Sequence, residues 1–457
     1  MFYFNKDLPL TQDKLFQMLS KFDQTVVPVL EKNKNYYDGI QKILQKQYSD
    51  KSKPNNQTVI NYCKNIVDSY CGYMATPGCI SYNSDNNIDD IMEVLKYNDY
   101  QAEDSDFLLD ALIYGTAAEL MYVDHDGKTR FRTIDPRSCF GIFDDCLTNE
   151  LLYFVRRYKS YDWNTTETDE YYVDVYSDKE VTHYKCTGKT GGLTLLGIEG
   201  HYFNQCPANI FTMPDEKSVF DCIMSLQDTV NELISTEVDD YSAFCDAYLV
   251  LNNVDADTDS INTMKENRVL VLPQGATASW LTKSANDTQV ENILKRAHDS
   301  IYRISSCVDF SSETFTGGVS SGIAIQFKLS GMETRAGKIE AQMKKALQRR
   351  IELICGIASL KLGEEVFRDI NILFTRNVPA DEAAIVNMVN ALKGTVSDAT
   401  LLTQIPFVTD VDKELEAVKE QKQENMSLYS FGNITGEDED DTGLLGREDG
   451  SSSKQAD

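Results

Sequence analysis

The tripeptide Gly188-Lys189-Thr190 is the part of the sequence that comes closest to a nucleotide-binding motif. A phosphate-cradling P-loop needs another glycine five residues before Gly188, and His183 occupies that position. A P-loop also needs a helix directly after it, whereas Gly191-Gly192 leads into strand-like residues. The pattern therefore argues against an ATPase.

Other catalytic arrangements are equally hard to find. The sequence has no G-x-S-x-G and no H-E-x-x-H. The 4 histidines lie far apart and none is spaced from a cysteine like a zinc ligand, so we expect no metal and no cofactor. The 72 Asp and Glu residues keep a two-metal nuclease open as an alternative, although abundance alone is not a motif.

Cysteine usage and hydropathy bear on the compartment. The 11 cysteines are scattered and include no C-x-x-C pair, as expected for free thiols in a reducing environment. The sequence has no apolar run long enough to span a membrane. Its start lacks the apolar stretch of a signal peptide. We expect a protein made and kept in a cytoplasm, with no membrane partner.

The formal net charge of −28 limits the ways in which the protein can meet DNA. Duplex binding normally relies on neutralisation of phosphates by Lys and Arg, so we expect only weak affinity. Two interpretations stay open. The charge either keeps the protein soluble or forms an acidic surface past which DNA moves without sticking.

Apolar spacing predicts helices first and strands after them. Helical periodicity covers 11–47 and then about 58–74, 87–95 and 104–114. From Glu119 to Met213 the period changes to two, and Asp126-Gly127 predicts a hairpin turn between strands 120–124 and 129–134. An antiparallel meander is expected to continue through strands at 151–158, 171–176, 181–186 and 193–198.

Two amphipathic helices surround a short β-rich segment in the next part of the chain. Ser218-x-x-Asp221 predicts the start of a helix that runs to about Phe244. Thr288-x-x-Glu291 predicts the start of a second helix, ending at about Ser306. The strands expected between them lie at 247–252, 267–272 and 277–282.

A third and longer helix follows a loop rich in Ser, Thr and Gly. Its apolar stripe extends from Ile325 to Ile354. Five cations lie on an arc beside this stripe: Lys328, Arg335, Lys338, Lys345 and Arg349. A strand at 370–375, a helix to about Lys393 and a helical segment from 397 to about 423 are expected next, which gives an α+β fold class overall.

The order of these segments resembles the portal proteins of tailed bacteriophages, in particular the family of phages and prophages of Gram-positive bacteria. No single stretch is a catalytic motif, and the specificity lies in their collinear order. The resemblance covers roughly residues 35 to 420 and is carried by Leu120 to Pro136, Lys265 to Leu270, Ala278 to Lys283, Phe315 to Leu329, Ala346 to Cys355 and Ile372 to Glu382.

The resemblance implies a ring-forming, non-enzymatic subunit, usually in twelve copies, with a wing, a two-helix stem, a small clip, a channel loop and a helical crown. By match, the segments are an N-terminal arm (1–50), wing (51–216), stem helices (217–244 and 287–306), clip (245–286), channel loop (307–321), long basic helix (322–361), wing return (362–393) and crown (394–432). The acidic tail (433–457) matches nothing and is expected from its composition to be disordered.

The same match assigns roles to particular residues. The channel loop would present Asp309, Phe310, Ser311, Thr314, Phe315, Thr316, Gly317, Gly318, Ser320 and Ser321. Stem packing between neighbouring copies would use Val219, Ile223, Leu226, Val230, Leu233, Ile293, Ala297, Ile301 and Ile304. Docking of a partner at the clip would use Asp255, Asp257 and Asp259.

Several roles keep two interpretations. Phe310 and Phe315 either pack under the loop or touch DNA. The cation arc either pairs with acidic groups of adjacent subunits or forms a ring of positive charge near DNA. The three clip aspartates form either a solvated turn or an acidic docking surface.

The resemblance also implies partners and a location. They are double-stranded DNA held weakly and without sequence preference, the terminase large subunit, a head–tail adaptor, and the major capsid and scaffold proteins. The protein would sit at a capsid vertex of the virion after assembly in the host cytoplasm. The alternatives are a nucleic-acid-processing enzyme with a carboxylate metal site and another phage head protein.

Overall fold

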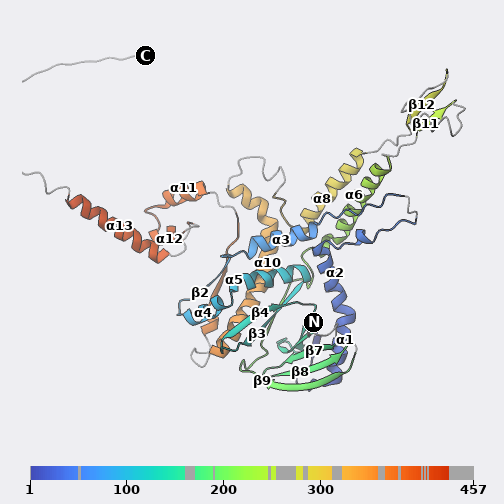
Figure 1. Ribbon diagram of the computed structural model, residues 1–457. Helices are drawn as coiled ribbons and strands as arrows, with labels where there is room; N and C mark the ends of the chain where they lie inside the picture. The colour runs from blue at the N-terminus through green and yellow to red at the C-terminus, as the bar shows by residue number, and fades with distance from the viewer. Residues whose placement is uncertain are drawn as a thin grey trace, which may run out of the picture. The chain divides into compact units, whose positions relative to one another are not determined.

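Figure 1 shows the protein as a computed structural model with a mixed helix and strand architecture, which confirms the α+β class. The chain divides into two units, Met1–Val378 and Pro379–Asp457. The structure describes residues 2–49, 53–159, 170–188, 191–244, 249–253, 274–280, 287–310, 322–358, 366–378, 382–402, 405, 408 and 411–431.

The N-terminal arm is helical, as its spacing predicts, and it also contributes a strand. Its first helix starts after Thr11, whose hydroxyl accepts a hydrogen bond from the Lys14 N–H (3.4 Å). Its second helix ends at Gly39, which has left-handed backbone (φ 82°). The arm comprises β1 (Phe2–Phe4), α1 (Gln12–Lys21), a π-helical turn (Phe22–Val26) and α2 (Val27–Asp38).

Three helices follow, each shifted slightly from its predicted start. The first begins at Tyr62 rather than Thr58, because the preceding backbone is extended and bonds to side chains of a later helix. Gly115 ends the third in left-handed backbone (φ 84°), and a Cβ there would meet the Lys217 backbone at 2.8 Å. The helices are α3 (Tyr62–Met74), α4 (Asp89–Tyr97) and α5 (Tyr100–Tyr114).

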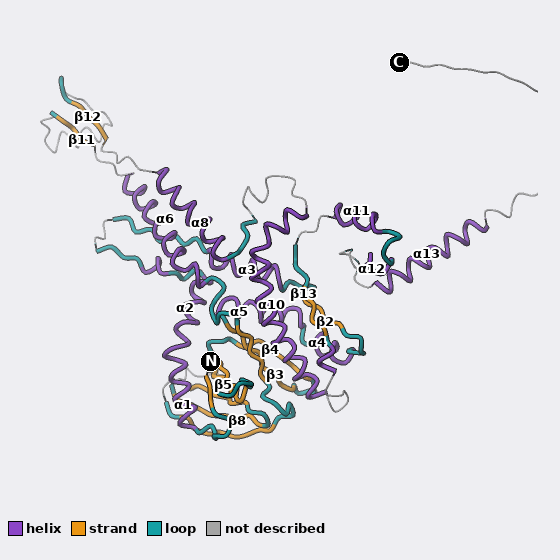
Figure 2. The backbone as a smooth tube through the Cα atoms, turned by 180° about the vertical axis from the view of Figure 1, so that it is seen from behind, coloured by secondary structure: helices purple, strands orange, loops and turns teal. Residues whose placement is uncertain are grey.

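Two sheets form most of the β structure (Figure 2). The larger has the order β1-β5-β6-β7-β8-β9, and its antiparallel part from β6 to β9 confirms the predicted meander. The smaller has the order β10-β3-β4 and contains the predicted hairpin. The strands are β3 (Thr116–Val123), β4 (Thr129–Ile134), β5 (Cys139–Asp144), β6 (Leu151–Lys159), β7 (Glu170–Tyr176), β8 (Glu180–Thr187), β9 (Leu193–Gly200) and β10 (Ala208–Thr212).

Sequence analysis missed the strands β1, β5 and β10, together with β2 (Ile80–Asn83). β5 is buried along nearly its whole length, so its residues show no polar alternation. β1 and β2 are too short to display a period of two. β2 pairs in antiparallel fashion with β13 (Asn371–Phe374), the strand predicted at 370–375.

Two antiparallel helices, α6 (Met224–Phe244) and α8 (Asp287–Ser305), correspond to the two predicted amphipathic helices. The α-helix starts later than the Ser218 pattern predicted, because Ser218 donates its hydroxyl to the Leu112 carbonyl and a 3₁₀ turn (Asp221–Ile223) intervenes. Between the helices lie two paired strands, β11 (Leu249–Asn252) and β12 (Thr277–Trp280). The strand predicted at 267–272 lies outside the described residues.

The longest helix, α10 (Gly322–Ala358), confirms the predicted third helix. Its apolar stripe faces inward and joins the main core together with side chains of α3, α5 and the lower parts of α6 and α8. The stripe is fully or nearly fully buried at Leu329, Met332, Ala336, Ile339, Met343, Leu347 and Ile354.

The second unit contains α11 (Glu382–Leu392), α12 (Asp398–Leu402) and α13 (Val411–Phe431). The boundary between the units falls inside the segment assigned to the wing return, so β13 belongs to the first unit and α11 to the second. α13 extends further than the predicted end at about 423. In the described part of the chain, no helix is both long and apolar enough to cross a membrane.

Two isoleucines about one turn apart on α8 should contribute unequally to the free energy of unfolding. Ile301 is fully buried, whereas Ile304 is 49% exposed. We expect Ile301→Ala to lower the free energy of unfolding by about 2–4 kcal/mol. Ile304→Ala should change it by less than about 0.5 kcal/mol. Urea denaturation followed by circular dichroism measures both, and equal losses would contradict the assigned burial.

Candidate functional site

A row of polar side chains on α6 holds an extended segment of the chain against the helix. Gln227, Asn231, Ser235 and Asp239 recur every four residues and are buried. Each accepts a hydrogen bond from a backbone N–H within residues 56–62, at 2.6–3.0 Å. The side chains of α6 therefore provide acceptors for these backbone N–H groups, as a neighbouring strand does in a β-sheet. The four-residue polar repeat was the sequence signal for this contact, and sequence analysis missed it.

Asp239 closes this row near the upper end of α6. It accepts hydrogen bonds from the Asn56 N–H (2.6 Å) and from Lys46 (3.3 Å). Burial by itself raises the pKa of Asp239, but these hydrogen bonds outweigh burial and hold the pKa below its usual value. α6 is thus fixed to the N-terminal part of the chain along most of its length.

Arg335 of α10 connects the end of α8 with the segment that precedes α6. Its guanidinium donates to the carbonyls of Ser305 and Val219, each at 2.8 Å. Tyr70 of α3 donates to the same Ser305 carbonyl (3.0 Å), and the guanidinium lies 5.8 Å from the Tyr70 ring centre. Ser305 ends α8, so the cation lies where the helix carbonyls lack partners.

The predicted arc of cations consequently needs correction. Arg335 and Arg349 are engaged within this chain, since Arg349 pairs with Glu352 (2.8 Å) and donates to Gln205. Their guanidinium groups are therefore not free to form a ring of charge near DNA or to pair mainly with a neighbour. The side chains of Lys328, Lys338 and Lys345 are exposed, and the two interpretations stay open for these lysines.

Arg350, which sequence analysis did not single out, lies at the centre of a buried ionic network. Its Nη1 group donates to Asp104 of α5, and its Nε–H donates to Oε2 of Glu119 of β3 (3.0 Å). The ion pair with Glu119 also places Nη2 2.8 Å from Oε1. Its guanidinium also lies 4.5 Å from the Phe131 ring centre. Asn209 of β10 donates to Glu119 (3.3 Å) and so ties a further strand into the network.

Burial governs the charge balance of this network, in which all three ionic side chains are almost completely shielded from solvent. Desolvation raises the pKa of Asp104 and of Glu119, and the nearby Arg350 works in the opposite direction. Two carboxyl groups share one guanidinium. Removal of the guanidinium therefore leaves both without a countercharge.

The stem stripe is divided between the interior and the surface. Five of the predicted packing residues lie in the chain's own core: Val219, Ile223, Val230, Ala297 and Ile301. These five cannot form the seam between copies, which corrects the prediction. Leu226 and Leu233 are half-buried, whereas Ile293 and Ile304 are 40% and 49% exposed.

Of the residues singled out in the predicted channel loop, the structure describes Asp309 and Phe310. The Asp309 carboxylate lies 3.6 Å from Nε2 of His298 on α8, and Phe310 is 41% exposed. The remaining loop residues, Ser311, Thr314, Phe315, Thr316, Gly317, Gly318, Ser320 and Ser321, lie outside the described residues, as do the clip residues Asp255, Asp257 and Asp259.

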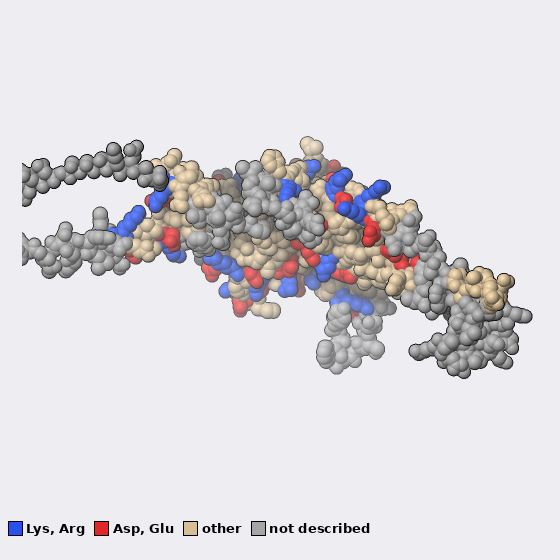
Figure 3. Space-filling model, turned by 90° about the horizontal axis from the view of Figure 1, so that it is seen from above, with Lys and Arg blue, Asp and Glu red and all other residues tan. Residues whose placement is uncertain are grey.

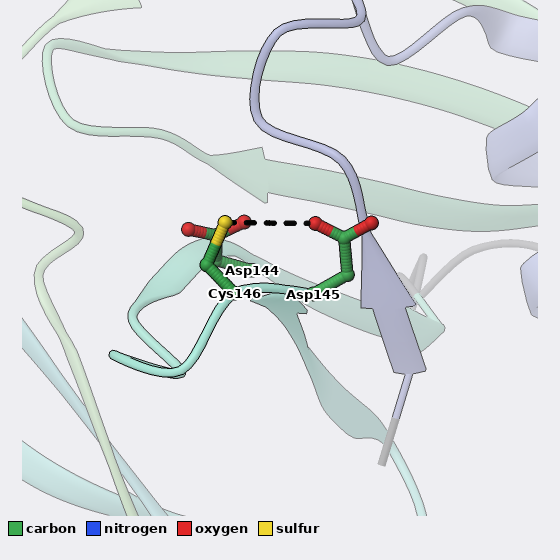
Figure 4. A group of neighbouring side chains, drawn as sticks. All are labelled: Asp144, Asp145 and Cys146. Carbon is green, nitrogen blue, oxygen red and sulfur yellow. Dashed lines mark hydrogen bonds between the residues drawn. The ribbon is translucent and has the colours of Figure 1, made fainter.

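One group of metal-capable side chains occurs in the described residues, at the end of β5 (Figure 4). It consists of Asp144, Asp145 and Cys146, whose ligand atoms all lie within 4.8 Å of one another. The Lys6 ammonium lies 3.7 Å from Asp144 and already supplies a countercharge. A thiol beside two carboxylates also differs from the oxygen ligands that Mg²⁺ prefers. The group therefore gives no support to a two-metal nuclease.

The surroundings of the Asp110 carboxyl group on α5 disfavour its ionised form. Burial, followed by the negative charges of Asp135 and Asp106, raises its pKa to about 7. No hydrogen bond or ion pair of its side chain is found among the described residues. Asp110 is therefore a group whose ionisation opposes the folded state.

The contacts described above hold helices and strands together. Comparison with known proteins shows the family to which the chain belongs. The family described as phage portal protein, SPP1 Gp6-like, matches residues 21–428, which include both sheets apart from β1, the α6–α8 pair and α10. The chain belongs to this family. The match confirms the resemblance inferred from the order of segments and shows a phage portal function.

Two relatives are similar over nearly their whole length. The portal protein of Bacillus phage SPP1 is 21% identical over 444 residues, which cover 91% of this chain and 84% of the relative. The portal protein of Clostridium phage phiCD119 is 21% identical over 443 residues, which cover 88% of this chain and 95% of the relative.

We predict that Arg350→Met strongly destabilises this portal subunit. The substitution leaves the carboxylates of Asp104 and Glu119 buried without a cation, which should lower the free energy of unfolding by about 3–5 kcal/mol. Lys345→Met, on the same helix but exposed, should cost less than about 0.5 kcal/mol. Urea denaturation at pH 7 measures both, and a loss below 1 kcal/mol for Arg350→Met would refute the assigned role.

A second prediction concerns pH. Between the unfolded pKa of Asp110 and its folded pKa of about 7, the folded chain binds a proton that the unfolded chain has released. The contribution of this group to stability therefore falls as pH rises through that window. Asp110→Asn should stabilise the protein by on the order of 2 kcal/mol at pH 8 and by clearly less at pH 5. The exposed control Asp90→Asn should show no such trend, and a pH-independent effect of Asp110→Asn would count against the shifted pKa.

Proposed function

We propose that this portal subunit assembles with copies of itself into a closed ring, expected to have twelve members, at one vertex of a phage capsid. Double-stranded DNA passes through the central channel during packaging and ejection. The protein acts as a structural, non-enzymatic part of this machine. Assembly takes place in the host cytoplasm, and the ring remains in the virion.

The observation that carries this proposal is the apolar surface that a single chain leaves uncovered along the stem. Ile293 and Ile304 on α8 are 40% and 49% exposed, and Val238 and Tyr241 on α6 are 38% and 73% exposed. Exposed apolar side chains that recur along a pair of helices are one feature of protein interfaces. Because α6 and α8 already pack against each other, their outer faces need another chain, and a cyclic assembly supplies one to every copy.

In this proposal, each part of the subunit has a separate role. The two sheets, α3 to α5 and β13 form the wing, and α6 and α8 form the stem. The segment that contains β11 and β12 is the clip, which docks the terminase large subunit and later the head–tail adaptor. The segment with α12 and α13 is the crown, and the major capsid and scaffold proteins contact the ring from outside.

The contact with DNA is proposed to be weak and independent of sequence. The chain carries 72 acidic and 44 basic residues, so it does not neutralise a long stretch of phosphates. The hydroxyl-rich and glycine-rich loop between α8 and α10 can contact phosphates without a fixed charge. This arrangement suits a channel through which DNA must slide.

The loop provides the test of this function. We expect removal of residues 313–319 to leave the mass of the assembled ring unchanged, because the loop lies outside the helices that pack the stem. Packaging of DNA into capsids should fall at least tenfold. Mass photometry measures the ring, and nuclease-protected DNA measures packaging. A deletion of equal length within 441–447 of the acidic tail is the control, and normal packaging by the loop variant would contradict the assigned channel role.

A further inference from the structure

Charged side chains of opposite sign are interspersed on the face seen in Figure 3, where Lys and Arg lie next to Asp and Glu. Among the described residues, such a surface holds no broad field of one sign, so it does not favour a highly charged ligand. The same chain contains a cavity of about 420 Å³ between the N-terminal arm and the two sheets, and its lining is mainly apolar.

This cavity lies where three apolar clusters meet without merging. Phe22 and Phe140 belong to the cluster between the arm and the larger sheet, Ala118 and Ile210 to the cluster between the sheets, and Leu30 to the main core. All five line the cavity. Protein interiors are close-packed, with few voids larger than a water molecule. A volume of this size is instead within the range of ligand pockets, which is about 300–1,000 Å³.

The backbone of the arm has an unusual conformation beside the cavity. Pro28 has no N–H to donate to the carbonyl of Gln24, and the helix widens there into the π-helical turn Phe22–Val26. The N–H of Val27 consequently bonds to the carbonyl of Phe22, five residues earlier. Side chains of this turn line the cavity. Single π-helical turns of this kind occur frequently at functional sites.

Asn33 of α2 brings a buried polar group to the cavity. It is 4% exposed and lies on the inner face of the helix, between the buried Leu30 and Tyr36. Its side chain lines the cavity and has no hydrogen-bond partner among the described residues. A buried amide without a partner costs free energy, because it has left water without a replacement bond. A ligand with a hydrogen-bonding group removes this cost.

Charged groups lie at the rim of the cavity and not in its interior. Lys217 and Asp221 form an ion pair at 3.4 Å, and their side chains are 66% and 40% exposed. Glu216 beside them is exposed as well. The hydroxyls of Thr116 and Ser218 already donate to backbone carbonyls. The described lining therefore gives a charged ligand no buried countercharge, and it suits an uncharged one.

We propose that this cavity binds an uncharged aromatic molecule that forms a hydrogen bond with Asn33. The rings of Phe2 and Phe22 each lie 4.9 Å from the ring of Phe140, and aromatic ligands pack well against such groups. A bound molecule connects the arm, both sheets and the residues that lead into α6. The proposal concerns a single subunit and does not depend on the ring.

N-phenyl-1-naphthylamine, an uncharged aromatic amine whose fluorescence rises in apolar surroundings, tests this site. We expect saturable binding of one probe per purified chain. Val29→Trp should raise the Kd more than about tenfold, because Val29 lines the cavity at an exposed position and the indole takes up part of the volume. Asn33→Leu should raise it about fivefold to tenfold through the loss of one hydrogen bond.

Two further probes test the chemical class of the ligand. Naphthalene has no hydrogen-bonding group, so its Kd, obtained by displacement of the first probe, should be similar for the parent and for Asn33→Leu. 1-Anilinonaphthalene-8-sulfonate adds a negative charge to the skeleton of the first probe and should bind about tenfold more weakly. Equal or tighter binding of the sulfonate would contradict an uncharged ligand.

Val123→Trp on β3 and Asn83→Leu on β2 are matched controls. Both positions are exposed and lie outside the cavity lining, so both variants should bind the probe like the parent. Circular dichroism checks the fold of every variant. A parent without saturable binding would overturn the proposal, as would an unchanged Kd in Val29→Trp. An unchanged Kd in Asn33→Leu would remove the role of its amide. Mass photometry of the same samples reports ring formation separately, so that failure of this site and failure of the proposed function are distinguishable.

Discussion

Two arginines on one long helix hold the subunit together. Arg350 lies where α10 packs against α5 and the smaller sheet, and it pairs with buried carboxylates from α5 and β3. Arg335 lies four turns earlier, at a distance of about 22 Å along the helix, and binds carbonyls at the end of α8 and just before α6. The direction of α6 and α8 is therefore set by the same helix that contacts the sheets.

One side of α6 and of α8 packs within the chain, and the other side is exposed. The polar row on α6 ties that helix to residues 56–62, and Ile301 anchors α8 in the core. The side chains left at the surface of α6 and α8 include apolar ones such as Ile304 and charged ones such as Glu232 and Arg296. These exposed groups are the ones open to a contact between copies in the proposed ring.

Much of the fold could be predicted because its signals are local. The apolar stripe of α10 and the Asp126-Gly127 hairpin are periodic patterns that a single sequence displays. The strand β5 could not be found, because its burial on both faces removes the alternation that marks a strand. The start of α6 was misplaced since Ser218 bonds to Leu112, a partner more than a hundred residues away in the chain.

Site residues were harder to predict than the fold for the same reason. A single sequence does not distinguish the exposed from the buried positions of an apolar stripe. Sequence analysis therefore gave Ile301 and Ile304 the same role, although Ile301 is buried and Ile304 is exposed. The arginines of α10 were assigned to DNA or to adjacent subunits because their partners, a buried carboxylate pair and two backbone carbonyls, come from distant segments. Family membership, by contrast, follows from collinear order over residues 21–428 and needs none of these contacts.

Electron microscopy of the purified protein tests the central claim most directly. The account predicts closed rings with a central hole, in which neighbouring copies cover the exposed faces of α6 and α8. A protein that stays monomeric at every concentration, alone and together with its capsid and scaffold proteins, would contradict it. So would a ring in which these two helices face solvent.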